Sequence, residues 1–285
     1  MSTRKHARCI YLGLPAFNEE LAIAPLFERI RVARAELLHR GMLSDLRVIF
    51  YDDGSTDATA EQVRLHCNGL EVSLLSPKSN GGLGVAMRGL ITQFLDQAQK
   101  DDVLVVMDSD DTHDPNQIIE LLTVMDESEK DVVIASRYRR GSRVAGVPTY
   151  RQILSLGFGT LVGVTLPIRG VRDYSCGYRA YTYGALAKVA TESGFPIQES
   201  GFASMPEILI RLRGNALSFG EIPLKLAYDR RLTVSKMRAW QNSRRLLSRI
   251  ISWRVFPKRL NDEPFAGPDS RIWWEIRLIT SKVTD

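Results

Sequence analysis

Hydrophobic and polar positions alternate with two different periods along the first half of the chain. Short apolar runs of strand length occupy residues 9–14, 47–51, 71–75, 103–107 and 131–135. The segments between them carry apolar residues at helical spacing, at about 22–38, 55–66, 84–98 and 116–125. Strands that alternate with helices in this way predict an α/β fold with a mostly parallel, Rossmann-like sheet and helices on both faces.

The pattern is less regular after Arg151. It predicts an apolar helix, a polar segment at 173–179, helices at about 185–192 and 206–213, and a strand over 218–227. No internal repeat or linker interrupts residues 1–236. We therefore expect one domain over 1–236, followed by a basic appendage over 237–285.

Composition describes a globular protein, with 44% hydrophobic and 25% charged residues among 285. The three cysteines, Cys9, Cys67 and Cys176, form no CxxC pair, which fits a reducing compartment. The basic start is followed by too short an apolar stretch for a secretory signal. The longest uncharged apolar stretch, 153–168, is shorter than the ~20 residues of a membrane-spanning helix. We therefore expect a cytoplasmic protein without a signal peptide or transmembrane helix.

Positive charge is concentrated near the C-terminus. Residues 225–259 contain eleven lysines and arginines and one acid, Asp229. Within this segment, 237–255 reads as a basic amphipathic helix carrying Trp240 and Trp253. Such a helix can lie on an anionic membrane surface, or it can pack on the preceding domain with its basic face exposed.

Four polar loops follow the predicted strands, at 15–20, 52–57, 108–115 and 136–138. Ligands of open α/β sheets bind outside the carboxyl ends of the strands. We therefore expect these loops to converge on one cleft.

The loop after the fourth strand carries the acidic run 107–115. Asp108 and Asp110 are separated by one residue and directly follow a buried strand. Carboxylates in this position can hold Mg²⁺ or Mn²⁺, a hard cation that also binds phosphate oxygens. The alternative is an acidic turn that caps the next helix, with Asp114 as the cap and Pro115 as the first helical residue.

The other loops suggest contacts with a nucleotide. Asn18 and Glu19 on the first loop, and Asp52 or Asp53 on the second, can accept hydrogen bonds from a base or ribose, although each is also a common turn residue. The glycine-rich segment 80–84 fails the GxGxxG test, because Met87 stands at the last position and the loop follows the third strand. Six cations on predicted loops could face a diphosphate: Arg137, Arg151, Arg179, Arg230, Arg231 and Lys236.

These motifs form an ordered series over about residues 9–237. They are PAFNEE (15–20), DDGSTD (52–57), the glycine-rich 80–86, MDSDDTHDP (107–115), SRY (136–138), DYSCGYR (173–179) and DRRLTVSK (229–236). The series resembles family 2 glycosyltransferases of the GT-A fold, and within them the dolichyl- and polyprenyl-phosphate sugar synthases. The resemblance implies a metal-dependent, inverting transfer of a hexose from GDP-mannose or a UDP-sugar to a polyprenyl phosphate.

The resemblance also implies roles for individual positions. The nucleotide-sugar site would comprise Pro15, Asn18, Glu19, Asp52, Asp53, Gly84, Asp108, Ser109, Arg230 and Lys236. The residues nearest the chemistry would be Asp110, Arg137, Arg151, Asp173, Arg179 and Glu207. Asp108 and Asp110 would hold Mg²⁺ or Mn²⁺.

The chain departs from the family pattern around the acidic run. Asp111 stands where the family has leucine, and Thr112 where it has a glutamine expected to help the metal, which leaves water or His113 to complete the coordination. Thr233 replaces a usual glycine in the last motif, and SGFR has become Cys176–Arg179. These departures leave donor and acceptor open.

Two other functions fit parts of the sequence. The first is a soluble glycosyltransferase of the same fold that acts on a small-molecule or sugar hydroxyl, for which Asp173 or Glu207 could serve as general base. The second, less favoured, is a non-catalytic nucleotide or nucleic-acid binder that uses the basic tail. The ordered motifs favour an enzyme, and we expect no nucleic-acid partner.

Overall fold

The computed structural model describes residues 8–145, 157, 159–191, 194–230 and 277–280. The expected boundary at 236 and the expected amphipathic helix at 237–255 lie outside these ranges, as do Arg151, Arg231 and Lys236. The strands are β1 (Cys9–Ala16), β2 (Asp45–Asp52), β3 (Glu71–Leu75), β4 (Val103–Val106), β5 (Val132–Ser136), β6 (Arg143–Ala145), β7 (Arg179–Thr182), β8 (Phe219–Pro223), β9 (Lys225–Ala227) and β10 (Arg277–Thr280). The helices are α1 (Glu20–His39), α2 (Thr59–His66), α3 (Leu83–Gln97), η1 (Pro115–Gln117), α4 (Ile118–Glu127), α6 (Tyr183–Ala187), α7 (Ser204–Arg213) and η2 (Tyr228–Arg230), with a further helical segment at 159–165.

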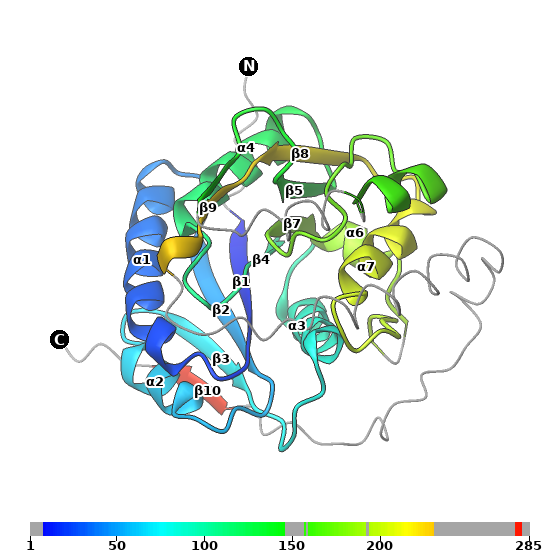
Figure 1. The fold of residues 1–285 in the computed structure, drawn as a ribbon. Helices are drawn as coiled ribbons and strands as arrows, with labels where there is room; N and C mark the ends of the chain where they lie inside the picture. Colours follow the sequence, from blue (N-terminus) through cyan, green and yellow to red (C-terminus); the bar gives the residue numbers. More distant parts are fainter. Residues whose placement is uncertain (1–7, 146–156, 158, 192–193, 231–276, 281–285) are drawn as a thin grey trace.

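One large sheet forms the centre of the molecule (Figure 1), with the strand order β10-β3-β2-β1-β4-β7-β5-β8. β1 pairs in parallel with β2 and β4, β2 with β3, and β5 with β8. β7 is antiparallel to both neighbours, and β10 is antiparallel to β3. The expected mostly parallel α/β sheet is therefore confirmed.

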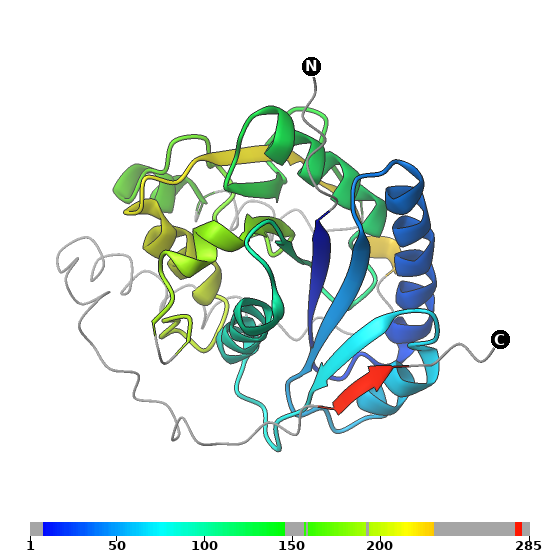
Figure 2. The same cartoon turned by 180° about the vertical axis from the view of Figure 1, so that it is seen from behind.

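Helices cover both faces of this sheet. α1, α2 and α4 lie on one side, and α3, α6 and α7 lie on the other, as the two opposite views show (Figures 1 and 2). α1 illustrates how the sequence produces this arrangement, because it buries one apolar stripe. In α1 the buried residues are Ala22, Ile23, Leu26, Phe27, Ile30, Ala33 and Leu37. They pack into one core with the apolar residues of β1, which are shielded on both faces of the sheet.

The second half of the chain differs from the sequence expectation in two places. The strand expected over 218–227 is two strands in two sheets, because β8 ends at Pro223, which has no N–H to donate to a ladder, and β9 pairs with β6. The helix expected over 185–192 is the short α6. Thr191 and Gly194 form a bridge beyond its end, and Gly194 has a φ of 95°.

The topology fixes where the polar loops meet. β1, β2 and β4 are parallel neighbours, so their carboxyl ends lie at one edge of the sheet. The loops that begin after Ala16, Asp52 and Val106 consequently lie side by side at that edge. Within the described part of the chain, no helix is long and apolar enough to cross a membrane.

Candidate active site

The first two strand-end loops are joined through Asn18. The Asn18 backbone N–H donates to Ser55 Oγ at 2.8 Å, and Asn18 Oδ1 accepts the Thr56 N–H at 2.8 Å. Asn18 has a φ of 54°, a left-handed conformation that asparagine tolerates better than most residues. Asp52 Oδ1 accepts the Ser55 N–H at 3.0 Å. Asn18 and Asp52 therefore shape the two loops, whatever they contact in a complex.

Asp53 anchors the glycine-rich segment beside these loops. Its two carboxylate oxygens accept the N–H groups of Gly81 and Gly82, both at 2.8 Å. Burial raises the pKa of Asp53, and these two hydrogen bonds partly offset the effect. The Asp53 side chain thus holds a neighbouring loop in place, which is a sufficient reason for an acid at this position.

Gly84 lies against the segment before α7. A Cβ at Gly84 would stand 1.6 Å from the carbonyl oxygen of Glu199, and the Gly84 N–H donates to the carbonyl of Ser200 at 2.8 Å. Only glycine fits this approach of two backbones. The contact accounts for the glycine without a ligand, so a nucleotide contact by Gly84 stays a prediction.

The acidic loop after β4 is attached to the first loop. Ser109 Oγ donates to the carbonyl of Pro15 at 2.9 Å. Asp108 is exposed, and a Cβ at Gly177 would lie only 3.1 Å from its Oδ1. Asp110 is buried, and its Oδ1 accepts the Thr112 hydroxyl at 2.7 Å. The two carboxylates therefore belong to one rigid loop.

His113 contacts the backbone of this loop and the ring of Tyr178. Its Nδ1 accepts the Asp108 N–H at 3.1 Å, and its ring lies 5.0 Å from that of Tyr178. The ring is thus engaged by the protein on one nitrogen and on one face. These contacts are those of a residue that supports the loop, and metal coordination by His113 stays a prediction.

The oxygen ligands of the acidic loop suit a cation whose coordination shell is completed by the substrate. Among the residues that the structure describes, no cluster of three or more His, Cys, Asp or Glu side chains is arranged to hold a metal. Mg²⁺ is commonly bound through one or two carboxylates together with substrate phosphates. Asp108 and Asp110 fit that kind of site.

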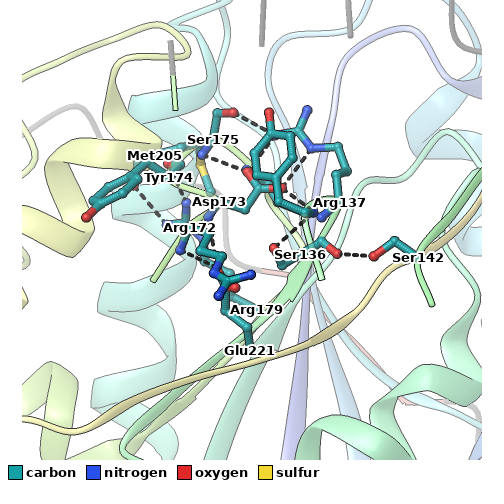
Figure 3. Close-up of polar contacts among 12 residues, drawn as sticks. Ser136, Arg137, Ser142, Arg172, Asp173, Tyr174, Ser175, Arg179, Met205 and Glu221 are labelled. Atoms are coloured by element: carbon teal, nitrogen blue, oxygen red, sulfur yellow. Dashed lines mark hydrogen bonds and ion pairs between the residues drawn. The ribbon is translucent and has the colours of Figure 1, made fainter. Parts of the chain in front are cut away.

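An ion pair between Arg137 and Asp173 joins the loop after β5 to the segment before β7 (Figure 3). Arg137 donates from Nε and Nη2 to the two oxygens of Asp173, at 2.8 and 2.6 Å, and also from Nη2 to Ser175 Oγ at 2.6 Å. Asp173 is wholly buried and further accepts the N–H groups of Ser175 and Cys176.

The electrostatics of this pair follow from its geometry. Burial alone would raise the pKa of Asp173, but Arg137 and the hydrogen bonds outweigh it and hold the pKa below the ordinary value. Burial alone would likewise lower the pKa of Arg137, and Asp173 more than reverses this. Both groups are therefore charged, and Asp173 is a weak base.

Arg179 and Glu207 lie inside the protein. Arg179 is 0% exposed and donates to the carbonyls of Met205 and Tyr174, both at 2.8 Å (Figure 3). Glu207 pairs with Arg211 at 2.8 Å and accepts the N–H groups of Gln198 and Glu199. Arg179 connects β7 to α7, and Glu207 fixes the segment that contacts Gly84. Both side chains are thus engaged within the protein, and their expected roles near the chemistry stay predictions.

The segment that carries Arg230 is attached to the acidic loop through its backbone. The Ala227 N–H donates to the Thr112 carbonyl at 3.0 Å, and His113 forms a bridge with Leu226. Arg230 is exposed on η2, and its charge contributes, after burial, to lowering the pKa of Arg29 on α1. Arg230 therefore lies near the acidic loop, on the side of α1.

A pocket connects several of these parts. Two of its lining residues have polar side chains, Asp108 and Ser175, and the others are Pro15, Leu83, Met87, Val106, Gly177, Phe202 and Met205. The sequence reasoning identified only Pro15 and Asp108 among them. Ser175 and Gly177 lie within the DYSCGYR motif, and that motif is the sequence signal for them. No local pattern marked Phe202 or Met205.

The mostly parallel sheet, with the acidic loop at its carboxyl edge and the pocket beside it, has the GT-A fold of nucleotide-sugar glycosyltransferases. A solved structure supports this fold. It is glucosyl-3-phosphoglycerate synthase from Mycobacterium tuberculosis in complex with Mn²⁺, uridine diphosphate and glucosyl-3-phosphoglycerate, with a TM-score of 0.58 at 19% identity over 88% of this chain and 81% of that one.

The chain belongs to glycosyl transferase family 2, whose model matches residues 11–189. It is 28% identical over 245 residues to polyprenol monophosphomannose synthase of Mycolicibacterium smegmatis, covering 85% of both chains. It is 30% identical over 200 residues to dolichol-phosphate mannosyltransferase of Pyrococcus furiosus, which covers 70% of this chain and 51% of that relative. The chain thus spans about half of the Pyrococcus protein and most of the Mycolicibacterium one.

Proposed function

We propose that this enzyme transfers a hexose, with inversion, from a GDP- or UDP-sugar to a polyprenyl phosphate, with Mg²⁺ or Mn²⁺ held by Asp108 and Asp110. Among the relatives, polyprenol monophosphomannose synthase and dolichol-phosphate mannosyltransferase carry names that support this acceptor. The cation, when bound, neutralises charge on the departing nucleotide diphosphate.

The main support for a phosphate acceptor is that both candidate bases are buried and already paired with an arginine. Asp173 is wholly buried and paired with Arg137, and Glu207 is wholly buried and paired with Arg211. A sugar hydroxyl needs a base within hydrogen-bonding reach, whereas a phosphate oxygen is already ionised and needs only positioning and charge neutralisation. Engaged bases therefore favour a phosphate acceptor.

The pocket supports an acceptor that has both a charged and an apolar part. Asp108 and Ser175 lie on its polar side, and Ser175 Oγ is bonded to the Arg137 guanidinium at 2.6 Å. Phe202 lines the apolar side and is 43% exposed. In the proposed complex, Arg137 helps to orient a phosphate, and Phe202 contacts the first isoprene unit.

The second candidate, a small-molecule or sugar hydroxyl acceptor, is tested in the same experiment. The purified protein is incubated with Mn²⁺ or Mg²⁺ and a panel of GDP- and UDP-sugars. Each mixture receives a short polyprenyl phosphate, glycerol phosphate, a free sugar or no acceptor. Release of free nucleotide diphosphate and formation of the glycosylated acceptor are measured.

We expect release that depends on both the cation and the polyprenyl phosphate. Transfer to the free sugar, with none to the lipid phosphate, would refute the proposed acceptor. Full turnover in an Asp110→Ala protein would refute the metal assignment.

A further inference from the structure

Asp111 is a third carboxylate in the acidic loop, next to Asp110. It is 4% exposed and has a φ of 66°, in the left-handed region that non-glycine residues seldom occupy. A buried acid in this conformation is unfavourable unless something neutralises and holds it. The family pattern has leucine here, so this chain carries one more acid than the proposed metal site needs.

Arg29 on α1 contacts Asp111 in two ways. Its Nη2 forms an ion pair with the Asp111 carboxylate and donates to the Asp111 carbonyl oxygen at 2.9 Å. The Arg29 side chain is itself only 25% exposed. One guanidinium thus holds both the charge and the backbone of residue 111.

The residues on either side of Asp111 are fixed as well. Thr112 donates from its N–H and its hydroxyl to Asp110 Oδ1, at 3.2 and 2.7 Å. These contacts between Asp110 and Thr112 close a turn at residue 111, which is where Arg29 binds. The orientation of the Asp110 carboxylate therefore depends on the turn that Arg29 holds.

We propose that Arg29 is a positioning residue that withdraws the Asp111 charge from the nucleotide diphosphate and fixes the turn between Asp110 and Thr112. The inference rests on the metal and donor site proposed above. Without Arg29, the Asp111 carboxylate is unneutralised beside a site that must accept a diphosphate. Loss of Arg29 should therefore weaken binding of the metal and the nucleotide together, because the Asp111 charge repels the diphosphate.

The test measures binding of UDP and of GDP in the presence of Mn²⁺ by calorimetry, together with the midpoint of thermal unfolding. Arg29→Met is expected to weaken Mn²⁺-dependent binding of the preferred nucleotide about five-fold or more, equivalent to about 1 kcal/mol. The double variant Arg29→Met/Asp111→Asn removes the stranded charge and keeps a residue suited to positive φ, so its affinity returns to within about two-fold of the parent.

A matched control lies on the same helix. Arg34 pairs with Asp45 at 2.8 Å, and Arg34→Met is expected to leave nucleotide affinity unchanged. If Arg29→Met does not fold, the double variant and Arg29→Lys test the proposal instead. Each is expected to bind the nucleotide with an affinity within about two-fold of the parent.

Unchanged affinity in folded Arg29→Met would overturn the proposal. The proposal would also be overturned if the double variant bound the nucleotide as weakly as Arg29→Met. In that case the loss of affinity would come from lost packing of the Arg29 side chain and not from the Asp111 charge. A parent protein that shows no Mn²⁺-dependent nucleotide binding would instead refute the metal site itself, so the two failures are distinct.

Discussion

The carboxylate of Glu221 on β8 accepts the backbone N–H of Asp173 at 2.8 Å, so that one buried acid holds a second acid in place (Figure 3). Glu221 Oε1 also accepts the Arg172 N–H at 2.6 Å. Asp173 in turn holds Arg137, which is bonded to Ser175 at the pocket. A chain of contacts therefore runs from β8, at one edge of the large sheet, to the pocket.

Asp173→Asn is expected to lower the free energy of unfolding by about 3 kcal/mol near neutral pH, because it leaves Arg137 without its buried counter-charge. Since the folded pKa of Asp173 is below its unfolded value of 3.8, its contribution is fully present above pH 3.8 and is lost as the pH falls through the folded pKa. Urea unfolding of both proteins at about pH 7 and about pH 3 should show the difference between them shrinking.

The control for this prediction is Glu28→Gln, which breaks an exposed pair with Arg31 and should change stability by less than about 1 kcal/mol. An Asp173→Asn difference that stays constant across the pH range would mean that the ionised carboxylate is not what stabilises the segment.

Asp110→Asn is expected to reduce turnover about 100-fold or more, because the cation would lose one of its two protein carboxylates. Binding of nucleotide in the presence of Mn²⁺ should weaken in parallel. Both quantities are measured against Asp101→Asn, which changes an exposed acid before β4 and should behave as the parent. Equal turnover in the two variants would contradict the role of Asp110.

Gly84→Ala is expected to destabilise the protein by about 2 kcal/mol, since the new methyl group would overlap the Glu199 carbonyl and force α3 and the 199–200 segment apart. Gly214→Ala is the matched control, because nothing lies within 4 Å of a Cβ there. Thermal unfolding compares the two. If both variants unfold at the parent temperature, α3 and this segment are less closely packed than the structure indicates.

Phe202→Ser is expected to raise the KM for a polyprenyl phosphate about five-fold and to leave the KM for the nucleotide sugar unchanged, because the ring lines the apolar side of the pocket. Leu65→Ser, at a similarly exposed apolar residue on α2, serves as the control. An equal rise in the KM for both substrates would mean that Phe202 maintains the structure of the pocket and does not contact the acceptor.

Much of the fold could be predicted from local patterns in the first half of the chain. The strands and helices up to β5 agree with the expected segments to within a few residues, because each is a continuous stretch of one period. β7 could not be predicted as a strand of this sheet. Its few residues lie between two strands that are distant from it in sequence, and its antiparallel direction depends on those neighbours.

The candidate site was predictable to a different degree. The positions of Asp108 and Asp110 at a strand end followed from the pattern, and the structure agrees. Arg179 and Glu207 are expected near the chemistry from the resemblance, and the structure shows that both are buried in contacts with their own chain, so their roles stay predictions. A residue type and its spacing describe what a side chain can do, but they do not describe which partner is nearest.

The sequence by itself determined the alternation of strands and helices, and hence the edge of the sheet at which the polar loops gather, because periodicity and loop position are local properties of the chain. Only the tertiary structure decided which of those polar groups are used by the protein itself. Asp53 holds the glycine loop, Asp173 holds Arg137, and Arg29 holds Asp111. Such pairings join residues that are tens of positions apart, and burial and distance, which select them, exist only once the sheet has formed.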